Sequence, residues 1–227
     1  MPTEARDRAR STPSDTAVEA AQAVYTPLTL PLYDVIVHGL SNRFAWRCPT
    51  ERLVALYRNS LSSQHLEAGC GTGYFIDRAD PASFERLVLL DANRHCLARS
   101  AARLARYRPQ SQNANLLEPL EIAGGRFDSI ALTYVLHCLP GTLDWKLRAV
   151  DHLRALLREG GVLFGATILG RGINPNAAAR ALLRAYNAKG VFNNRGDDMY
   201  SLDRGLRDRF NDVRIERIGC VALFECR

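Results

Sequence analysis

The sequence has no uninterrupted apolar run long enough to cross a membrane, and no apolar run follows residues 1–10, which carry charges of both signs. We therefore expect neither a membrane anchor nor a signal peptide, and we expect a cytoplasmic protein. The six cysteines form no CxxC pair, and no cysteines and histidines are grouped at the spacing of zinc ligands. A metal site and a disulfide framework are therefore not expected.

The balance of charge is basic, with 30 Lys and Arg against 24 Asp and Glu and a net charge of +6. Such a balance can indicate an RNA partner. The densest basic stretch, however, surrounds Leu97, Ala101 and Leu104 at helical spacing, and it consists of Arg94, Arg99, Arg103, Arg106 and Arg108. This pattern favours the exposed face of a helix, so we expect no nucleic-acid partner.

Apolar runs and amphipathic segments alternate from residue 63 onward, which is typical of strands and helices that follow one another along the chain. We expect strands at 64–68, 86–90, near 113, 127–136 and 161–169, and helices at 74–78, 94–106 and 143–158. Helical crossovers of this kind imply a parallel sheet. Two more helices are expected, one at 175–187 after a cap at Asn174 and one at 202–210. The runs 213–218 and 221–225 are so close that they should form an antiparallel hairpin.

Three regions of the chain differ in composition. Residues 1–14 are polar and rich in arginine, and we expect a disordered tail. Residues 15–62 contain helical patterns at 17–25, 31–40 and 50–61, which we expect to form an N-terminal helical cap over the substrate. Residues 63–227 should form one α/β domain with helices on both faces of its sheet.

Residues 65–74 read His-Leu-Glu-Ala-Gly-Cys-Gly-Thr-Gly-Tyr and place three glycines where a strand should pass into a helix. Gly69, Gly71 and Gly73 would allow unusual dihedral angles and a close approach of the backbone to a ligand. A dinucleotide fingerprint, GxGxxG, would have glycine at position 74, where this chain has a tyrosine. Glu67 would repel a pyrophosphate but suits the ammonium group of an amino acid. The motif therefore favours a nucleoside ligand that carries an ammonium group.

Asp91 ends the apolar run 87–90, about 20 residues beyond the glycine turn. Ligands of open α/β sheets collect at the carboxyl ends of the strands, and a carboxylate there can accept hydrogen bonds from both ribose hydroxyls. The alternative is that Asp91 caps the helix that follows it. The distance from the glycine turn favours the ribose.

The acidic residue before GxGxG, Asp91 after the next strand and the C-terminal hairpin together resemble the Rossmann-like, or class I, S-adenosylmethionine-dependent methyltransferases. The resemblance covers residues 63–227 and implies S-adenosylmethionine as cofactor. It implies contacts of Asn115 with the adenine amino group and of Tyr33 with the cofactor carboxylate. Further cofactor contacts are implied at Ala92, Leu116 and Tyr134.

A second motif, residues 127–141, resembles the fourth strand and following loop of small-molecule methyltransferases, which often read Leu-His-His-Leu-Pro. Cys138 stands where that pattern has its second histidine. His137 could accept a proton from an attacking hydroxyl, because an imidazole titrates near neutral pH. The alternative is that His137 only packs against the cofactor as part of the loop.

Two groups of aromatic and amide side chains suit an acceptor pocket that is apolar with a few fixed polar contacts. They are His38, Asn42 and Trp46 from the N-terminal helices, and Asn187, Phe192 and Asn193 after the fifth strand. Taken alone, each of these residues is more often structural.

The chain lacks Asn-Pro-Pro-Tyr after its fourth strand, which the resemblance would require for methylation of exocyclic amines of DNA or of glutamine. It also lacks the acidic cluster of a magnesium-dependent catechol methyltransferase. We therefore expect an enzyme that methylates oxygen, nitrogen or carbon of a small molecule in specialised metabolism, as a monomer or homodimer. The alternatives are a cofactor-binding protein that transfers no methyl group, such as a cyclase or regulator, and an RNA methyltransferase.

Overall fold

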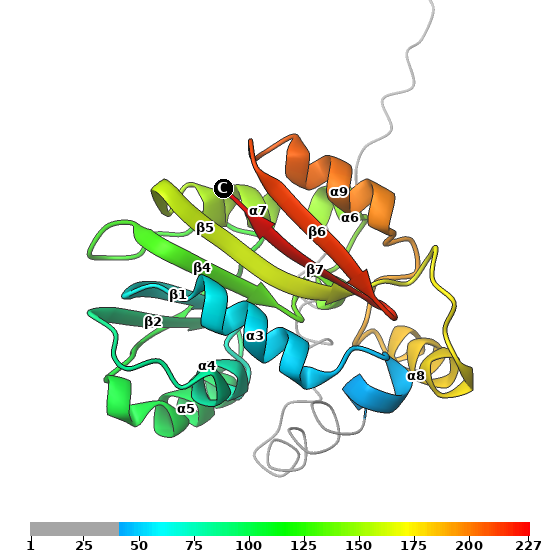
Figure 1. The fold of residues 1–227 in the computed structure, drawn as a ribbon, viewed down its shortest axis with the longest axis horizontal. Coiled ribbons are helices and arrows are strands. Elements are labelled where there is room, and N and C mark those ends of the chain that lie inside the picture. Colours follow the sequence, from blue (N-terminus) through cyan, green and yellow to red (C-terminus); the bar gives the residue numbers. More distant parts are fainter. Residues whose placement is uncertain (1–40) are drawn as a thin grey trace, which may run out of the picture.

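One seven-stranded sheet runs through residues 41–227, the part of the chain that the computed structural model describes (Figure 1). Its strands are β1 Gln64–Ala68, β2 Arg86–Asp91, β3 Gln110–Asn113, β4 Phe127–Thr133, β5 Leu157–Ile168, β6 Val213–Ile218 and β7 Val221–Cys226. The α-helices are α3 Thr50–Ser60, α4 Tyr74–Ala79, α5 Arg94–Arg103, α6 Leu143–Lys146, α7 Arg148–Arg154, α8 Ala177–Ala188 and α9 Met199–Arg207. Two 3-10 helices are η2 Ala105–Tyr107 and η3 Leu136–Cys138.

The strand order is β3-β2-β1-β4-β5-β7-β6. The pairs among β1 to β5 are parallel, whereas β7 runs antiparallel to both β5 and β6. This confirms the expected Rossmann-like sheet with a C-terminal antiparallel hairpin. The order of strands reverses between β1 and β4, and such a switch point opens a crevice at the carboxyl ends of the strands. The fold therefore places a ligand site above β1, β2 and β4.

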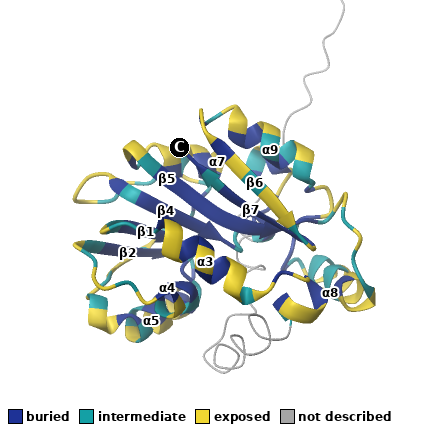
Figure 2. Ribbon diagram, in the orientation of Figure 1, coloured by how far each residue is buried: buried dark blue, intermediate teal, exposed yellow. Residues whose placement is uncertain are grey.

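Helices cover both faces of the sheet, and the strands between them are mostly buried (Figure 2). One core cluster joins one face to α3, α4, α5 and α8, and includes Tyr57, Ile76 and Phe164. The other joins the opposite face to α6, α7 and α9, and includes Leu147 and Leu206. Burial of these side chains supplies most of the driving force for folding.

Helix α3 belongs to the first of these clusters, with Leu53 and Tyr57 completely buried. It therefore packs on the sheet, although its residues fall in the region 15–62 that we expect to form a cap. The division into a tail, a cap and a domain stays a prediction, because residues 1–40 lie outside the described residues. Tyr33 and His38 lie there too. None of the helices in residues 41–227 is both long and apolar enough to span a membrane.

The expected helix at 143–158 is instead two helices, α6 and α7, on either side of Leu147. The chain has already entered β5 at Leu157, which pairs with Phe127 before a register shift in the β4–β5 ladder. Strand β4 ends at Thr133, three residues earlier than expected, because Tyr134 has a φ of +61° and leaves the extended conformation.

Two helix starts also differ from expectation. Asn176, not Asn174, caps α8, and its side chain accepts a hydrogen bond from the amide of Ala179. Helix α9 begins earlier than expected, at Met199, because Asp198 accepts a hydrogen bond from the amide of Ser201 and acts as its cap.

Candidate cofactor site

A cavity opens at the carboxyl ends of β1, β2 and β4, where the topology predicts a ligand site. Its lining comes from Glu67, Cys96 and the segments 69–75, 90–93, 114–116, 133–135 and 138–140. These segments include most of the residues that the sequence assigns to the cofactor. Two carboxylates stand in a lining that is otherwise largely apolar.

The glycine turn forms one wall of this cavity. The amides of Gly69 and Cys70 donate to the carbonyl of Leu90, so the turn is fixed against the end of β2. Gly69 has a φ of +76°, and a Cβ atom there would overlap Cγ2 of Val135. Glycine is thus required at this position both by the backbone conformation and by the close approach of the next loop.

Asp91 lies beside the turn at the end of β2. Its Oδ2 accepts a hydrogen bond from the amide of Gly71 at 3.1 Å, and its Oδ1 accepts one from the amide of Asn93 at 2.8 Å. Burial raises the pKa of this carboxyl group. Asn93, not Asp91, caps α5, since its side chain accepts from the amides of His95 and Cys96. The carboxylate of Asp91 therefore belongs to the cavity wall and not to the helix cap.

Glu67 lines the cavity from β1 and is 4% exposed. The hydroxyl of Tyr57 donates to its Oε1 at 2.6 Å, and Nε2 of His65 lies 3.2 Å from its Oε2. Sequence analysis did not find these two partners. The contact of Tyr57 depends on how α3 packs on the sheet, but strand alternation does place His65 on the same side of β1 as Glu67.

Ala92, Asn115 and Leu116 also line the cavity. Oδ1 of Asn115 accepts from the amide of Leu117 at 3.1 Å, and its Nδ2 donates to Glu118 at 3.2 Å. Leu116 is buried and supplies an apolar surface. This end of the cavity suits a flat, largely apolar ring with polar atoms at its edge.

Tyr134 also lines the cavity, and its hydroxyl donates to Oδ1 of Asn42 at 2.9 Å. Asn42 is completely buried and donates to Thr50 at 3.1 Å. The structure thus brings a predicted cofactor residue and a predicted acceptor residue into direct contact. Asn42 itself does not line the cavity.

His137 lies behind the cavity wall and is not part of its lining, whereas the adjacent Cys138 is. Nδ1 of His137 accepts a hydrogen bond from the amide of Ile168 at 3.3 Å, and its ring meets that of Phe192 at 4.5 Å. Burial lowers the pKa of His137 to about 3. The ring therefore stays neutral and packs in the core. Its role as a general base stays a prediction.

The other acceptor candidates among the described residues, Trp46, Asn187, Phe192 and Asn193, are also absent from the lining of the cavity. The rings of Trp46 and Phe192 are 6.1 Å apart, and Asn187 donates to Asn194 at 2.9 Å. The amide of Asn193 donates to the carbonyl of His137 at 2.8 Å. These residues support the loop 137–140 from behind, and their contact with an acceptor stays a prediction.

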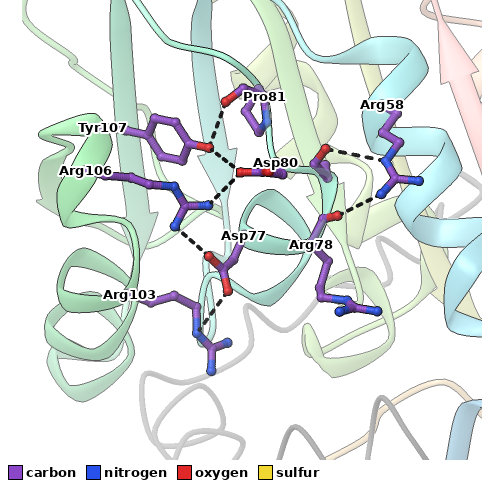
Figure 3. A network of polar contacts seen from close by, with 9 residues as sticks. Arg58, Asp77, Arg78, Asp80, Pro81, Arg103, Arg106 and Tyr107 are labelled. Carbon is purple, nitrogen blue, oxygen red and sulfur yellow. Dashed lines mark hydrogen bonds and ion pairs between the residues drawn. The ribbon is translucent and has the colours of Figure 1, made fainter.

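The basic stretch 94–108 is partly used in contacts between helices (Figure 3). Arg106 pairs with Asp77 at 2.7 Å and with Asp80 at 3.3 Å, and Arg103 lies 4.0 Å from Asp77. Tyr107 donates to the carbonyl of Pro81 at 2.8 Å. These contacts tie α5 and η2 to α4, so two of the five arginines have partners within the protein. Residues 41–227 hold no group of three or more His, Cys, Asp or Glu that could bind a metal ion.

Comparison with known proteins gives the same family. A family model described as a methyltransferase domain matches residues 66–163. The physcion biosynthesis cluster O-methyltransferase of Aspergillus chevalieri is 35% identical over 215 residues, which cover 94% of this chain and 97% of that protein. The demethylluteothin O-methyltransferase of Streptomyces thioluteus is 36% identical over 211 residues and 92% of each chain.

The fold agrees with solved structures as well. The N-methyltransferase NodS of Bradyrhizobium japonicum WM9, in complex with S-adenosylhomocysteine, aligns with a TM-score of 0.62 and 19% identity, covering 88% of this chain and 96% of that one. Because the cavity, the fold and relatives that match nearly the whole chain all agree, the protein belongs to the class I S-adenosylmethionine-dependent methyltransferases.

Proposed function

We propose that the protein transfers the methyl group of S-adenosylmethionine to a hydroxyl oxygen of a small organic molecule in specialised metabolism. The observation that carries this proposal is a cavity at the switch point of the sheet in which two carboxylates stand in a largely apolar lining. Oxygen as the acceptor atom is supported by relatives named O-methyltransferases that match more than nine-tenths of the chain.

The residues of the cavity fit the parts of this cofactor. Asp91 accepts hydrogen bonds from the ribose hydroxyls, because its carboxylate borders the cavity at the end of β2. Glu67 receives the ammonium group. Ala92, Leu116 and Asn115 enclose the adenine. When bound, the cofactor supplies an electrophilic methyl group on a sulfonium.

The protein itself then acts by holding the acceptor in line with the methyl group and by excluding water. Among the described residues, burial raises the pKa of Cys138 in the lining to about 12, and His137 is not in the lining, so neither is both placed and matched as a base at neutral pH. The acceptor of this proposal is an acidic hydroxyl, such as a phenol or an enol, which ionises readily and depends little on a protein base.

We further propose that the enzyme works in the cytoplasm on a diffusible acceptor, as a monomer or homodimer, without nucleic acid. A cyclase or regulator that binds the cofactor, or an RNA methyltransferase, has less support, because the named relatives are O-methyltransferases and part of the basic stretch pairs within the protein.

Methyl-labelled S-adenosylmethionine tests this proposal. The protein is incubated with the labelled cofactor and with matched sets of phenols, enols, amines and carbon nucleophiles, and the labelled products are identified by mass. We expect label on hydroxyl oxygen, increasing with the acidity of the hydroxyl. Label on nitrogen or carbon alone, or on RNA in place of the small molecules, would contradict the proposal.

A further inference from the structure

Both oxygens of Glu67 are held by side chains that do not line the cavity. Tyr57 reaches Oε1 from α3, and His65 reaches Oε2 from the same strand as Glu67. Both residues are completely buried. Two buried side chains outside the lining therefore hold the carboxylate, while Glu67 itself borders the cavity.

The hydrogen-bond directions in this cluster follow from Glu67, whose carboxylate can only accept, so that Nε2 of His65 donates to it. This assigns the ring hydrogen of neutral His65 to Nε2, from which it donates to Glu67. Nδ1 of His65 lies 2.8 Å from Oγ of Ser129, which also accepts from the amide of Ser62 at 3.0 Å. In that tautomer Nδ1 accepts from the hydroxyl of Ser129, so both ring nitrogens of His65 have a partner.

Tyr57 is equally fixed as a donor. Burial, followed by the charge of Glu67, raises the pKa of its phenol well above the ordinary value, so it keeps its hydrogen. The ring of Phe164 packs edge-on against Tyr57 at 5.1 Å and stacks on His65 at 6.0 Å. Packing and hydrogen bonds together leave the two donors little freedom to turn away.

Two donors do not satisfy a buried carboxylate, which can accept about four hydrogen bonds. Thr133 also lines the cavity, and its buried Oγ1 lies near the hydroxyl of Tyr57. The remaining acceptor positions of the Glu67 carboxylate call for a ligand or a water molecule, because buried polar groups are rarely left unsatisfied in folded proteins. An ammonium group brings three donors and a positive charge to such a place.

We propose that Tyr57 and His65 are positioning residues that orient the carboxylate of Glu67 toward the ammonium group of the cofactor. They act through Glu67 and do not touch the cofactor themselves. The proposal rests on S-adenosylmethionine as the cofactor and is independent of the acceptor. It adds a helix, α3, to the elements that determine cofactor affinity.

Two ligands that differ only in the amino acid test this role. S-adenosylhomocysteine carries the ammonium group, whereas 5′-methylthioadenosine has the same nucleoside and lacks the amino acid. Calorimetry on Tyr57→Phe and His65→Leu should show affinity for S-adenosylhomocysteine lowered about tenfold or more, with 5′-methylthioadenosine almost unaffected. His65→Gln, which keeps an amide donor at the position of Nε2, should recover most of the loss.

Phe164→Leu is the matched control, because it loosens the packing around both donors and removes no hydrogen bond. It should weaken the two ligands equally. The proposal is overturned if Tyr57→Phe also weakens both ligands equally, or weakens neither. If the wild-type protein prefers S-adenosylhomocysteine but Glu67→Gln keeps that preference, Glu67 is not the ammonium site. A wild-type protein that binds neither ligand would instead contradict the cofactor assignment.

Discussion

At the scale of single residues, the site depends on a carboxylate that backbone amides hold in place. Asp91 receives two such bonds and remains at the edge of the cavity, which is an arrangement that sequence spacing alone could only suggest. Its position could be predicted because a strand ends there. The identity of the helix cap could not, because Asn93 and Asp91 are both suitable caps by residue type.

We predict that Asp91→Ala lowers the affinity for S-adenosylmethionine by about 2 kcal/mol or more, since hydrogen bonds to a charged group contribute about 1.5 to 3 kcal/mol. Isothermal titration calorimetry measures the change directly. Asp80→Ala is the control, because Asp80 lies outside the cavity in the contacts of Figure 3. Equal affinities of the two variants would remove Asp91 from the ribose site.

His137 leads to a prediction on pH. Its pKa is lowered to about 3 in the fold, whereas an unfolded histidine titrates near 6.5. Below about pH 6.5 the unfolded chain binds a proton that the folded chain does not, so stability falls as the pH drops toward 3, by up to about 1.4 kcal/mol per pH unit.

Urea unfolding at pH 7 and pH 5 measures this effect. His137→Leu should be less stable than the wild type at pH 7 because it loses the contacts of the ring, yet it should lose less stability between the two pH values. If both proteins show the same pH dependence, His137 is not buried as a neutral ring. The contributions of the carboxyl groups cancel when the pH dependence of the variant is subtracted from that of the wild type, because both proteins contain the same carboxyl groups.

At the scale of elements, the alternation of strands and helices could be predicted because burial on both faces of a parallel sheet leaves a strong apolar pattern. The ends of the helices and strands were harder to predict. Strand β4 stops at Tyr134 because of a positive φ, and nothing in the local sequence other than the resemblance to a loop motif marks that position. The contact of Tyr57 with Glu67 depends on tertiary packing of α3, which local patterns do not contain, whereas strand alternation already places His65 on the side of Glu67.

The glycine turn gives a prediction at this scale. Gly69 and Gly160 both have a positive φ, +76° and +73°, so alanine costs a similar backbone strain of about 1 to 2 kcal/mol at either position. Only at Gly69 would the added Cβ atom meet another residue, Val135. Gly69→Ala should therefore lose a further 1 to 3 kcal/mol, roughly the cost of overpacking, and should weaken cofactor binding.

Chemical denaturation and calorimetry on the two variants separate these effects. Gly160→Ala should keep the cofactor affinity of the wild type, because Gly160 has nothing near its Cβ position and lies outside the cavity. If both variants lose the same stability and the same affinity, the close approach of Val135 to the turn is not what requires glycine.

At the scale of the whole molecule, one reversal of strand order brings together segments that are far apart in the sequence. Residues from 67 to 140 meet around one cavity, while α3 and the segment after β5 support it from behind. This explains why the cofactor side of the site could be predicted from two motifs. The acceptor candidates between Asn42 and Asn193 do not line the cavity. Their spacing in the sequence does not tell how deeply each side chain is buried.

The central claim is that this cavity binds S-adenosylmethionine, and a calorimetric titration of the wild-type protein tests it most directly. We predict saturable binding of S-adenosylmethionine and of S-adenosylhomocysteine at one site per chain, and no comparable binding of a nicotinamide dinucleotide. Saturable binding of the dinucleotide with none of S-adenosylmethionine would contradict the account.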